Sequence, residues 1–264
     1  MANLFKRAHR KLYRIMPVYR KIARVLMKNK IRGGVTKTVY LSHCNITADD
    51  SNEVVFADSD YTIVNVHINI NGKNNKIIFH ENLRVESSLT INIVGSNNMI
   101  EIGEYNRFIL NATDISLQGE NCKIITQQCC KFDNARILCS GNGTTISIGK
   151  ELDSQNPLLI DAMEDRNIII GNNVLMASNV KIRNNDGHSI LDKDGKRINP
   201  AKDVIIGDNI WICADVSILK GTVIPNGCVI GTKSLCSSPF KNENALIFGI
   251  PAMERKQDIC WKFR

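Results

Sequence analysis

Aliphatic residues recur at every sixth position in the C-terminal half of the chain. Isoleucine fills five consecutive positions of this series, at Ile206, Ile212, Ile218, Ile224 and Ile230. Small or β-branched residues follow four positions after each of them, at Ile210, Val216, Thr222, Cys228 and Ser234. A period of six fits neither an isolated helix nor a simple hairpin, but it fits a coil with three flat sides in which each hexad forms one short strand and one corner. The pattern therefore predicts a parallel β-helix whose aliphatic residues point towards its axis.

A polar tract interrupts this rhythm. The same phase holds earlier at Ile170, Met176 and Ile182, and Ile182 lies 24 positions before Ile206, a multiple of six. The intervening residues are too polar to lie inside a coil, so we expect residues 183–205 to leave the solenoid as a loop and return in register. Loops on a rigid scaffold commonly carry functional side chains.

Looser repeats precede the strict ones. Gly72, Gly95, Gly119 and Gly141 each stand at a Gly/Asn-rich corner between alternating aliphatic residues, 22 to 24 positions apart. We expect larger coils of the same solenoid with longer corners. A β-sandwich of regular hairpins is the alternative, and it is harder to dismiss for residues 40–150 than for the strict hexads.

The N-terminal segment is basic and amphipathic. Its apolar positions from Phe5 to Leu26 recur in steps of three and four, which predicts a helical stripe, and Pro17 divides or kinks that helix. Residues 1–40 carry twelve Lys or Arg and no acidic residue, so the remainder of this +8 chain has a net charge of −4. Three interpretations stay open: residues 1–32 lie on an anionic membrane, associate subunits, or pack on their own domain. Nucleic-acid binding is disfavoured because no recognition module follows.

Composition narrows the setting. The sequence has no run of eighteen apolar residues and no secretory signal, so we expect neither a transmembrane helix nor secretion. Nine scattered cysteines without a CxxC pair favour reduced thiols over a disulfide framework or a zinc site. We therefore expect a cytoplasmic protein without a metal site. If the basic segment binds lipid, the protein would lie at the inner face of the membrane.

The predicted organisation is all-β with one short helical segment. Residues 1–34 form the basic amphipathic segment, residues 35–150 the irregular β-helix coils, residues 151–250 the hexad coils that carry the loop, and residues 251–264 a C-terminal tail.

Several motifs in this order resemble a known family. The stretches IIIGNNVLMASNVKI, DGHSI, GKRIN, VIIGDNIWICADVSILKGTVIPNGCVIGTKS and GIPAMERKQDICW, within residues 160–261, resemble the hexapeptide-repeat acyltransferases, above all those that O-acetylate capsule or lipopolysaccharide sugars. Residues 1–150 share only the repeat character. The resemblance implies a left-handed parallel β-helix, an exception to the right-handed crossover rule. It also implies a homotrimer that binds acetyl-CoA between neighbouring subunits and acetylates a hydroxyl of a cell-surface polysaccharide sugar.

His188 matches the family's catalytic histidine in its Asp-x-His-x-Ile context. A neutral alcohol is a poor nucleophile, and an imidazole, which ordinarily titrates near about 6.5, suits the role of general base. We therefore expect His188 to deprotonate the acceptor hydroxyl during direct transfer, without an acyl-enzyme. Asp186 either orients the imidazole or only caps a turn. Glu164, on an adjacent coil, is a second candidate for orienting the imidazole and is also a candidate substrate-binding residue.

Two further residues are candidates for the acceptor. Trp211 stands at the family's tryptophan position, where it either stacks on a sugar, lines the acetyl pocket or packs against a neighbouring subunit. Arg183, just before the loop, either holds an acidic sugar or pairs with a local carboxylate. Two other activities remain open: N-acetylation of an amino sugar, and glycan binding by a non-catalytic β-helix.

For the donor, the resemblance implies contacts along the last coils. Backbone groups of Ala214, Gly231 and Thr232 would meet the pantetheine arm, and Lys233 or Lys256 the phosphates. The chain departs from the family at Cys213 and Ala214, where Gly or Ser is common, and at Met253, which replaces a basic residue.

Overall fold

The chain folds as a parallel β-helix. The computed structural model describes residues 31–32, 39–42, 45–57 and 61–262, and within these ranges the secondary structure consists of strands and turns, without a helix. Except for Ile31 and Arg32, the predicted N-terminal segment, residues 1–34, lies outside the described residues.

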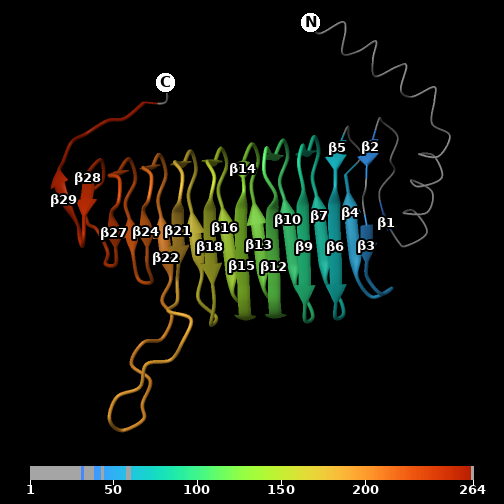
Figure 1. Ribbon diagram of the computed structural model, residues 1–264, viewed down its shortest axis with the longest axis horizontal. Helices are drawn as coiled ribbons and strands as arrows, with labels where there is room; N and C mark the ends of the chain where they lie inside the picture. Colours follow the sequence, from blue (N-terminus) through green and yellow to red (C-terminus); the bar gives the residue numbers. More distant parts are fainter. Residues whose placement is uncertain (1–30, 33–38, 43–44, 58–60, 263–264) are drawn as a thin grey trace, which may run out of the picture.

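Three sheets form the sides of the solenoid, and successive strands pass from one sheet to the next (Figure 1). The first sheet comprises β1 (Ile31–Arg32), β4 (Glu53–Phe56), β7 (Lys76–Phe79), β10 (Met99–Ile102), β13 (Lys123–Thr126), β16 (Thr145–Ile148), β19 (Ile168–Ile170), β22 (Val204–Ile206) and β25 (Val223–Ile224). The second comprises β2 (Val39–Ser42), β5 (Tyr61–Val64), β8 (Arg84–Val85), β11 (Arg107–Ile109), β14 (Lys131–Asp133), β17 (Asp153–Ser154), β20 (Leu175–Met176), β23 (Trp211–Ile212), β26 (Val229–Ile230), β28 (Leu246–Gly249) and β29 (Ala252–Lys256). The third comprises β3 (Asn45–Thr47), β6 (Val66–Asn71), β9 (Leu89–Val94), β12 (Thr113–Glu120), β15 (Ala135–Asn142), β18 (Leu158–Ala162), β21 (Val180–Arg183), β24 (Ser217–Ile218) and β27 (Leu235–Cys236).

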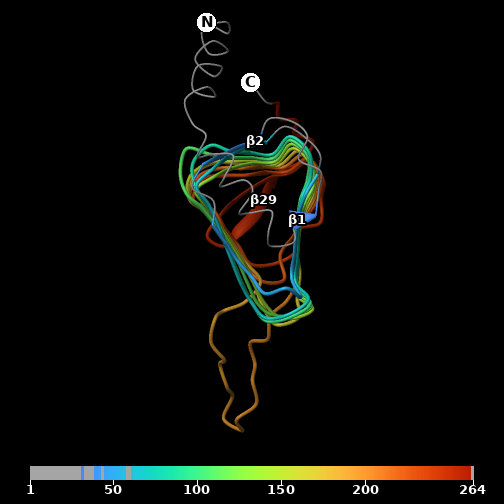
Figure 2. The ribbon, with the colours of Figure 1, turned by 90° about the vertical axis from the view of Figure 1, so that its right-hand side faces the viewer.

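The solenoid is left-handed, as the resemblance implied. Figure 2 views it from its N-terminal end, with β1 on the right and β2 at the top. The chain therefore turns counterclockwise as it recedes from the viewer, which defines a left-handed coil.

The strict hexads build the core as predicted. Ile206, Ile212 and Ile218 lie on the first, second and third sheets in turn, and all three are buried. Ile224 then pairs with Ile206, and Ile230 with Ile212, one coil later. Three hexads thus complete one coil, and each aliphatic side chain packs on its equivalent in the next coil.

The looser repeats belong to the same solenoid. Strands of residues 45–148 pair in parallel across consecutive coils, so the β-sandwich alternative is wrong for the described part of this region. Their longer corners contain a ladder of buried asparagines. Asn75 donates from Nδ2 to Asn52 Oδ1 at 3.0 Å and to the Gly95 carbonyl at 2.8 Å, and Asn98 repeats this pattern with Asn75 and Gly119. The ladder satisfies polar groups that the corner would otherwise bury unpaired.

One large excursion leaves the solenoid between β21 and β22, as the break in the hexads predicted (Figure 1). It occupies residues 184–203, at the corner where the chain passes from the third sheet to the first. We call this the loop corner. The corner between the second and third sheets, which Ala214 and Lys233 occupy, is called the second corner. Within the described part of the chain, no helix has the length and hydropathy needed to span a bilayer.

Candidate functional site

The excursion forms a hairpin-like arm of defined structure. Leu191 and Arg197 form an antiparallel bridge, and the Ile198 amide donates to the Ile190 carbonyl at 2.9 Å. At the tip, Asp192 Oδ1 accepts from the amides of Asp194 and Lys196, both at 2.9 Å. An aspartate that accepts from amides two and four positions ahead stabilises a tight turn. The two limbs of the arm are therefore held in register.

Two buried asparagines anchor the start of the arm to the preceding coil. Asn184 Oδ1 accepts from the Met163 amide at 2.8 Å, and its Nδ2 donates to the Arg166 carbonyl at 2.8 Å. Asn185 Nδ2 donates to the Asp161 carbonyl at 3.2 Å, while its Oδ1 accepts from the Gly187 amide at 2.9 Å. These bonds fix the backbone that leads directly into His188.

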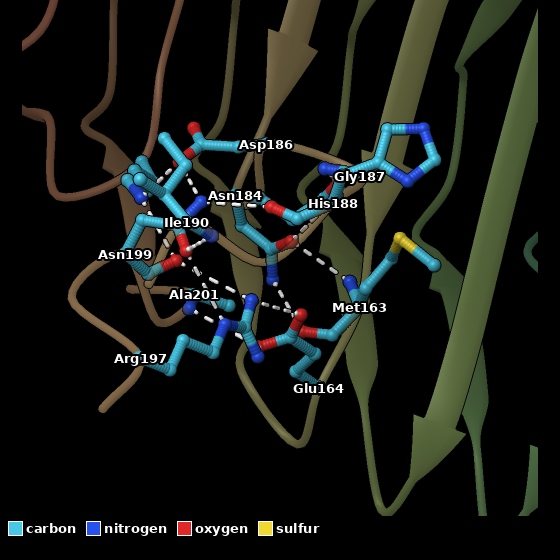
Figure 3. A network of polar contacts seen from close by, with 12 residues as sticks. Met163, Glu164, Asn184, Asp186, Gly187, His188, Ile190, Arg197, Asn199 and Ala201 are labelled. Atoms are coloured by element: carbon cyan, nitrogen blue, oxygen red, sulfur yellow. Dashed lines mark hydrogen bonds and ion pairs between the residues drawn. The ribbon is translucent and has the colours of Figure 1, made fainter. Parts of the chain in front are cut away.

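The His188 side chain is exposed, and its imidazole makes no hydrogen bond to any described residue. Figure 3 shows the ring pointing away from Asp186 and Asn199, on the side of Met163. The His188 backbone, by contrast, is fixed, because its carbonyl accepts from Asn199 Nδ2 at 2.8 Å. The arrangement presents a solvent-accessible ring on an ordered backbone, as a proton acceptor for an external substrate requires.

Asp186 secures the arm and does not contact the imidazole. Its Oδ2 accepts from Asn199 Nδ2 at 2.8 Å and from Lys220 Nζ. The hydrogen bond from Lys220, more than any other contact, holds the pKa of Asp186 below its ordinary value. Asp186 is therefore an ionised anchor that joins the arm to the next coil, and its predicted role in catalysis stays a prediction.

Glu164 is likewise engaged by the arm. Its carboxylate forms a bidentate pair with Arg197, with Nη1–Oε2 and Nη2–Oε1 distances of 2.8 and 2.7 Å. The hydrogen bond from Arg197 lowers the pKa of Glu164, and the amide of Ala201 supports the same carboxylate at 3.3 Å. The planar fork of arginine fixes such a pair in one geometry. Glu164 therefore holds the return limb of the arm.

Arg183 pairs with a local carboxylate, one of the two alternatives left open for it. Its Nε and Nη2 lie 3.0 and 2.9 Å from Asp161 Oδ2. The Asp161 side chain is mostly buried, whereas the Arg183 side chain is 38% exposed and its Nη2 lies near Gly187.

Trp211 lies on the second sheet, on β23, away from the arm at the loop corner (Figure 2). The side chain is 38% exposed, and its ring centroid lies 6.2 Å from that of Trp261 at an interplanar angle of 43°. Trp261 Nε1 donates to the Asn209 carbonyl at 2.7 Å, which ties the C-terminal tail to the solenoid. Trp261 was not among the predicted site residues, because the hexad pattern ends before the tail and assigns it no partner.

Four of the predicted donor-binding residues gather at the second corner. Ala214 lies one coil before Gly231, Thr232 and Lys233, and the Lys233 amide donates to the Ala214 carbonyl at 3.0 Å. Thr232 and Lys233 are exposed. Lys256, at the end of β29, is also exposed. The structure thus brings most of the predicted site residues together in two groups, one at the loop corner and one at the second corner, with the third sheet between them. Trp211 and Lys256 lie outside both groups, on the second sheet.

No known family model matches the chain. The chain is 32% identical over 134 residues to a polysialic acid O-acetyltransferase of Neisseria meningitidis, a match that covers 43% of this chain and 62% of that relative. It is 34% identical over 142 residues to a galactoside O-acetyltransferase of Lactococcus lactis, covering 53% and 61%. A putative lipopolysaccharide biosynthesis O-acetyl transferase of Escherichia coli is 29% identical, over 50% of this chain and 77% of that relative.

Two solved structures share the fold along most of their length. The crystal structure of the polysialic acid O-acetyltransferase OatWY matches with a TM-score of 0.53 and 26% identity, covering 86% of this chain and 90% of that one. The polysialic-acid-specific acetyltransferase NeuO matches with a TM-score of 0.50 and 25% identity, covering 89% and 82%. These similarities confirm the resemblance that the motifs indicated.

Proposed function

We propose that this chain, whose sequence and fold are similar to those of polysialic acid O-acetyltransferases, moves an acetyl group from acetyl-CoA to a hydroxyl of a cell-surface polysaccharide sugar. The observation that carries the proposal is His188: an exposed imidazole on a backbone that Asn199 of the return limb holds by hydrogen bonds at His188 and at Ile190. A ring that hydrogen-bonds to no described residue is free to accept a proton from a substrate hydroxyl.

The proposed chemistry is direct transfer. The imidazole of His188 accepts the hydroxyl proton while the hydroxyl oxygen attacks the thioester carbonyl. A carbon–oxygen bond forms, the carbon–sulfur bond breaks, and the proton passes from the imidazolium to the departing thiolate. No described serine or cysteine side chain bonds to the ring, which favours this sequence over an acyl-enzyme.

We propose that the site is completed by a second copy of the chain. The arm and the second corner are separated by the third sheet, so a thioester bound at the second corner of one copy would meet His188 of a neighbour. The outer face of the first sheet supports association. Ile169 pairs with Ile205 on the next strand, and Ile205 with Val223, so the three form an apolar stripe in which Ile169 and Ile205 are 42% and 39% exposed. A homotrimer would cover this apolar stripe. Native mass spectrometry tests the assembly, and an Ile169→Asp Ile205→Asp variant should dissociate it.

The acceptor is proposed to be acidic. Two relatives are named for polysialic acid, and the Arg183 side chain, next to the start of the arm, is 38% exposed. Polysialic acid should therefore be tried first in a screen of capsule and lipopolysaccharide saccharides. Thiol release from acetyl-CoA reports the transfer, and alkali lability of the product distinguishes an ester from the amide that N-acetylation would give.

Replacement of His188 by alanine tests the proposed function. Loss of a general base typically lowers the rate by about 10²–10⁴-fold, so the variant should lose transfer to this extent while it keeps the wild-type mass and thermal stability. Wild-type transfer by the variant would exclude His188 as the base. Intact mass after incubation with acetyl-CoA alone should show no acetylated protein, and a stoichiometric acetyl adduct would refute direct transfer. Absence of transfer by the wild-type chain to every saccharide would favour the non-catalytic glycan-binding alternative.

The basic segment, residues 1–32, is proposed to place a cytoplasmic enzyme at the inner face of the membrane. Residues 1–32 carry eleven Lys or Arg and no acidic residue, which favours an anionic lipid surface. Co-sedimentation with phosphatidylserine vesicles should require this segment, and phosphatidylcholine vesicles are the control. Equal pelleting of the full chain and of a chain lacking residues 1–32 would refute the membrane contact.

A further inference from the structure

We propose that Asn199 is a positioning residue for His188, an inference that rests on the proposed function. Asn199 lies on the return limb of the arm, and its side chain reaches three alternate residues of the outgoing limb. Its Nδ2 donates to Asp186 Oδ2 and to the His188 carbonyl, both at 2.8 Å, and its Oδ1 accepts from the Ile190 amide at 2.6 Å. One amide therefore holds the Asp186 side chain before the histidine, and the backbone at His188 and at Ile190 after it (Figure 3).

The position of Asn199 makes these bonds effective. Asn199 is only 7% exposed, although most of the neighbouring residues of the arm are exposed. A buried amide keeps its partners because water does not compete for them. Both hydrogen atoms of Nδ2 and the acceptor Oδ1 are used, so the contacts of Asn199 specify one arrangement of the two limbs.

Two basic residues, Lys220 and Arg197, hold the backbone of Asn199 itself. Lys220, on the coil that follows the arm, donates from Nζ to Asp186 and to the Asn199 carbonyl at 3.1 Å. Arg197 donates from Nη2 to the same carbonyl at 3.3 Å while it pairs with Glu164. The arm is thereby tied through Asn199 to the coil before it and to the coil after it. These contacts also give Asp186 a role: it lies two positions before His188, and its carboxylate ties this part of the outgoing limb to Lys220 and to Asn199.

The consequence concerns the reaction rate. No polar contact from a described residue fixes the imidazole, so the backbone that carries His188 sets the point from which the ring reaches a substrate. A general base must lie within hydrogen-bond distance of the hydroxyl that it deprotonates, and a misplacement of about 1 Å can cost about 10²-fold in rate. Asn199 should therefore influence turnover without contact with either substrate.

Two substitutions separate the contacts of Asn199. Asn199→Ala removes all three bonds. Asn199→Asp keeps the acceptor for the Ile190 amide but removes both donors and places a second carboxylate against Asp186. Lys193→Ala, at the exposed tip of the arm, is the matched control. We expect both Asn199 variants to lower kcat by about 10- to 100-fold, with an unchanged KM for acetyl-CoA and the wild-type oligomer mass, and the control to retain wild-type kinetics.

Amide hydrogen exchange supplies a readout that does not depend on activity. The Ile190 amide should exchange faster in Asn199→Ala but keep its protection in Asn199→Asp, whereas core amides of β22 should not change in either variant. Wild-type kcat in both Asn199 variants, together with an inactive His188→Ala, would overturn the positioning role and leave the proposed function intact. A parallel loss of kcat, acetyl-CoA binding and thermal stability would also overturn it, because Asn199 would then serve the fold as a whole. Activity in His188→Ala would instead refute the proposed function, and unchanged exchange at Ile190 would refute the inference even where no acceptor is found.

Discussion

Replacement of Gly119 by alanine should destabilise the solenoid far more than replacement of Gly143. Gly119 lies in β12 with φ +127°, and an added Cβ would lie 1.9 Å from the carbonyl oxygen of Gly141 in the next coil. Gly143 also has a positive φ, +84°, but an added Cβ there would meet no atom within 4 Å. Both substitutions place alanine at a positive φ, but only Gly119→Ala adds the clash.

The magnitudes follow from this difference. Alanine at positive φ costs about 1–2 kcal/mol, which is the expectation for Gly143→Ala. At Gly119 the φ region is nearly restricted to glycine, which costs about 1–3 kcal/mol. Relief of a 1.9 Å contact further requires β12 and β15 to separate beyond their usual spacing of about 4.8 Å, and each hydrogen bond lost costs about 0.5–1.5 kcal/mol. We therefore expect Gly119→Ala to lose about 3–5 kcal/mol in total.

Urea unfolding, followed by far-UV circular dichroism, measures the difference. Protein concentration must be the same for all variants, because self-association would add to the apparent free energy of unfolding. Reduced freedom of the unfolded chain affects both alanines alike and cancels in the comparison. Equal losses for the two variants, within about 0.5 kcal/mol, would refute the argument that coil-to-coil backbone contact at Gly119 excludes a side chain.

Three further predictions concern the core, the arm and the tail. Ile218→Ala should lower the free energy of unfolding by about 2–5 kcal/mol in urea titrations, since Ile218 is fully buried in the hexad core, whereas the exposed Ile198 should tolerate alanine with little change. The pKa of Glu164 is lowered in the fold, so the stability that its arginine pair contributes is present above the unfolded carboxyl pKa of about 4.3 and is lost as pH falls through the folded value. The melting-temperature difference between wild type and Glu164→Gln should therefore be largest near neutral pH and vanish in acid, and a constant difference would contradict this account. Trp261→Ala should expose Trp211 to acrylamide quenching of fluorescence, and Trp261→Phe, which keeps an aromatic ring at that position, should do so less.

The candidate site was partly predictable. His188 and the limits of its arm follow from the point at which the hexads stop, because polar residues cannot fill the axial positions of a coil. Asn199 and Lys220 carried no such signal: each is one of many polar residues near a corner, and its importance depends on which atoms it meets. Asp186 shows the same limit, since its sequence distance of two residues from His188 suggested a contact with the ring, while the folded arm turns it towards Lys220.

The sequence by itself determined the solenoid, its three-sided section and the place of the excursion, because a strict period of six dictates which side chains can be buried together. The tertiary structure decided how the arm is held and where the remaining site residues lie. The partners of the arm come from other coils, such as Glu164 for Arg197 and Lys220 for Asp186, and these pairings depend on the path of the arm through space. Trp211 belongs to the second sheet, away from the arm, because each hexad advances the chain by one face of the triangle.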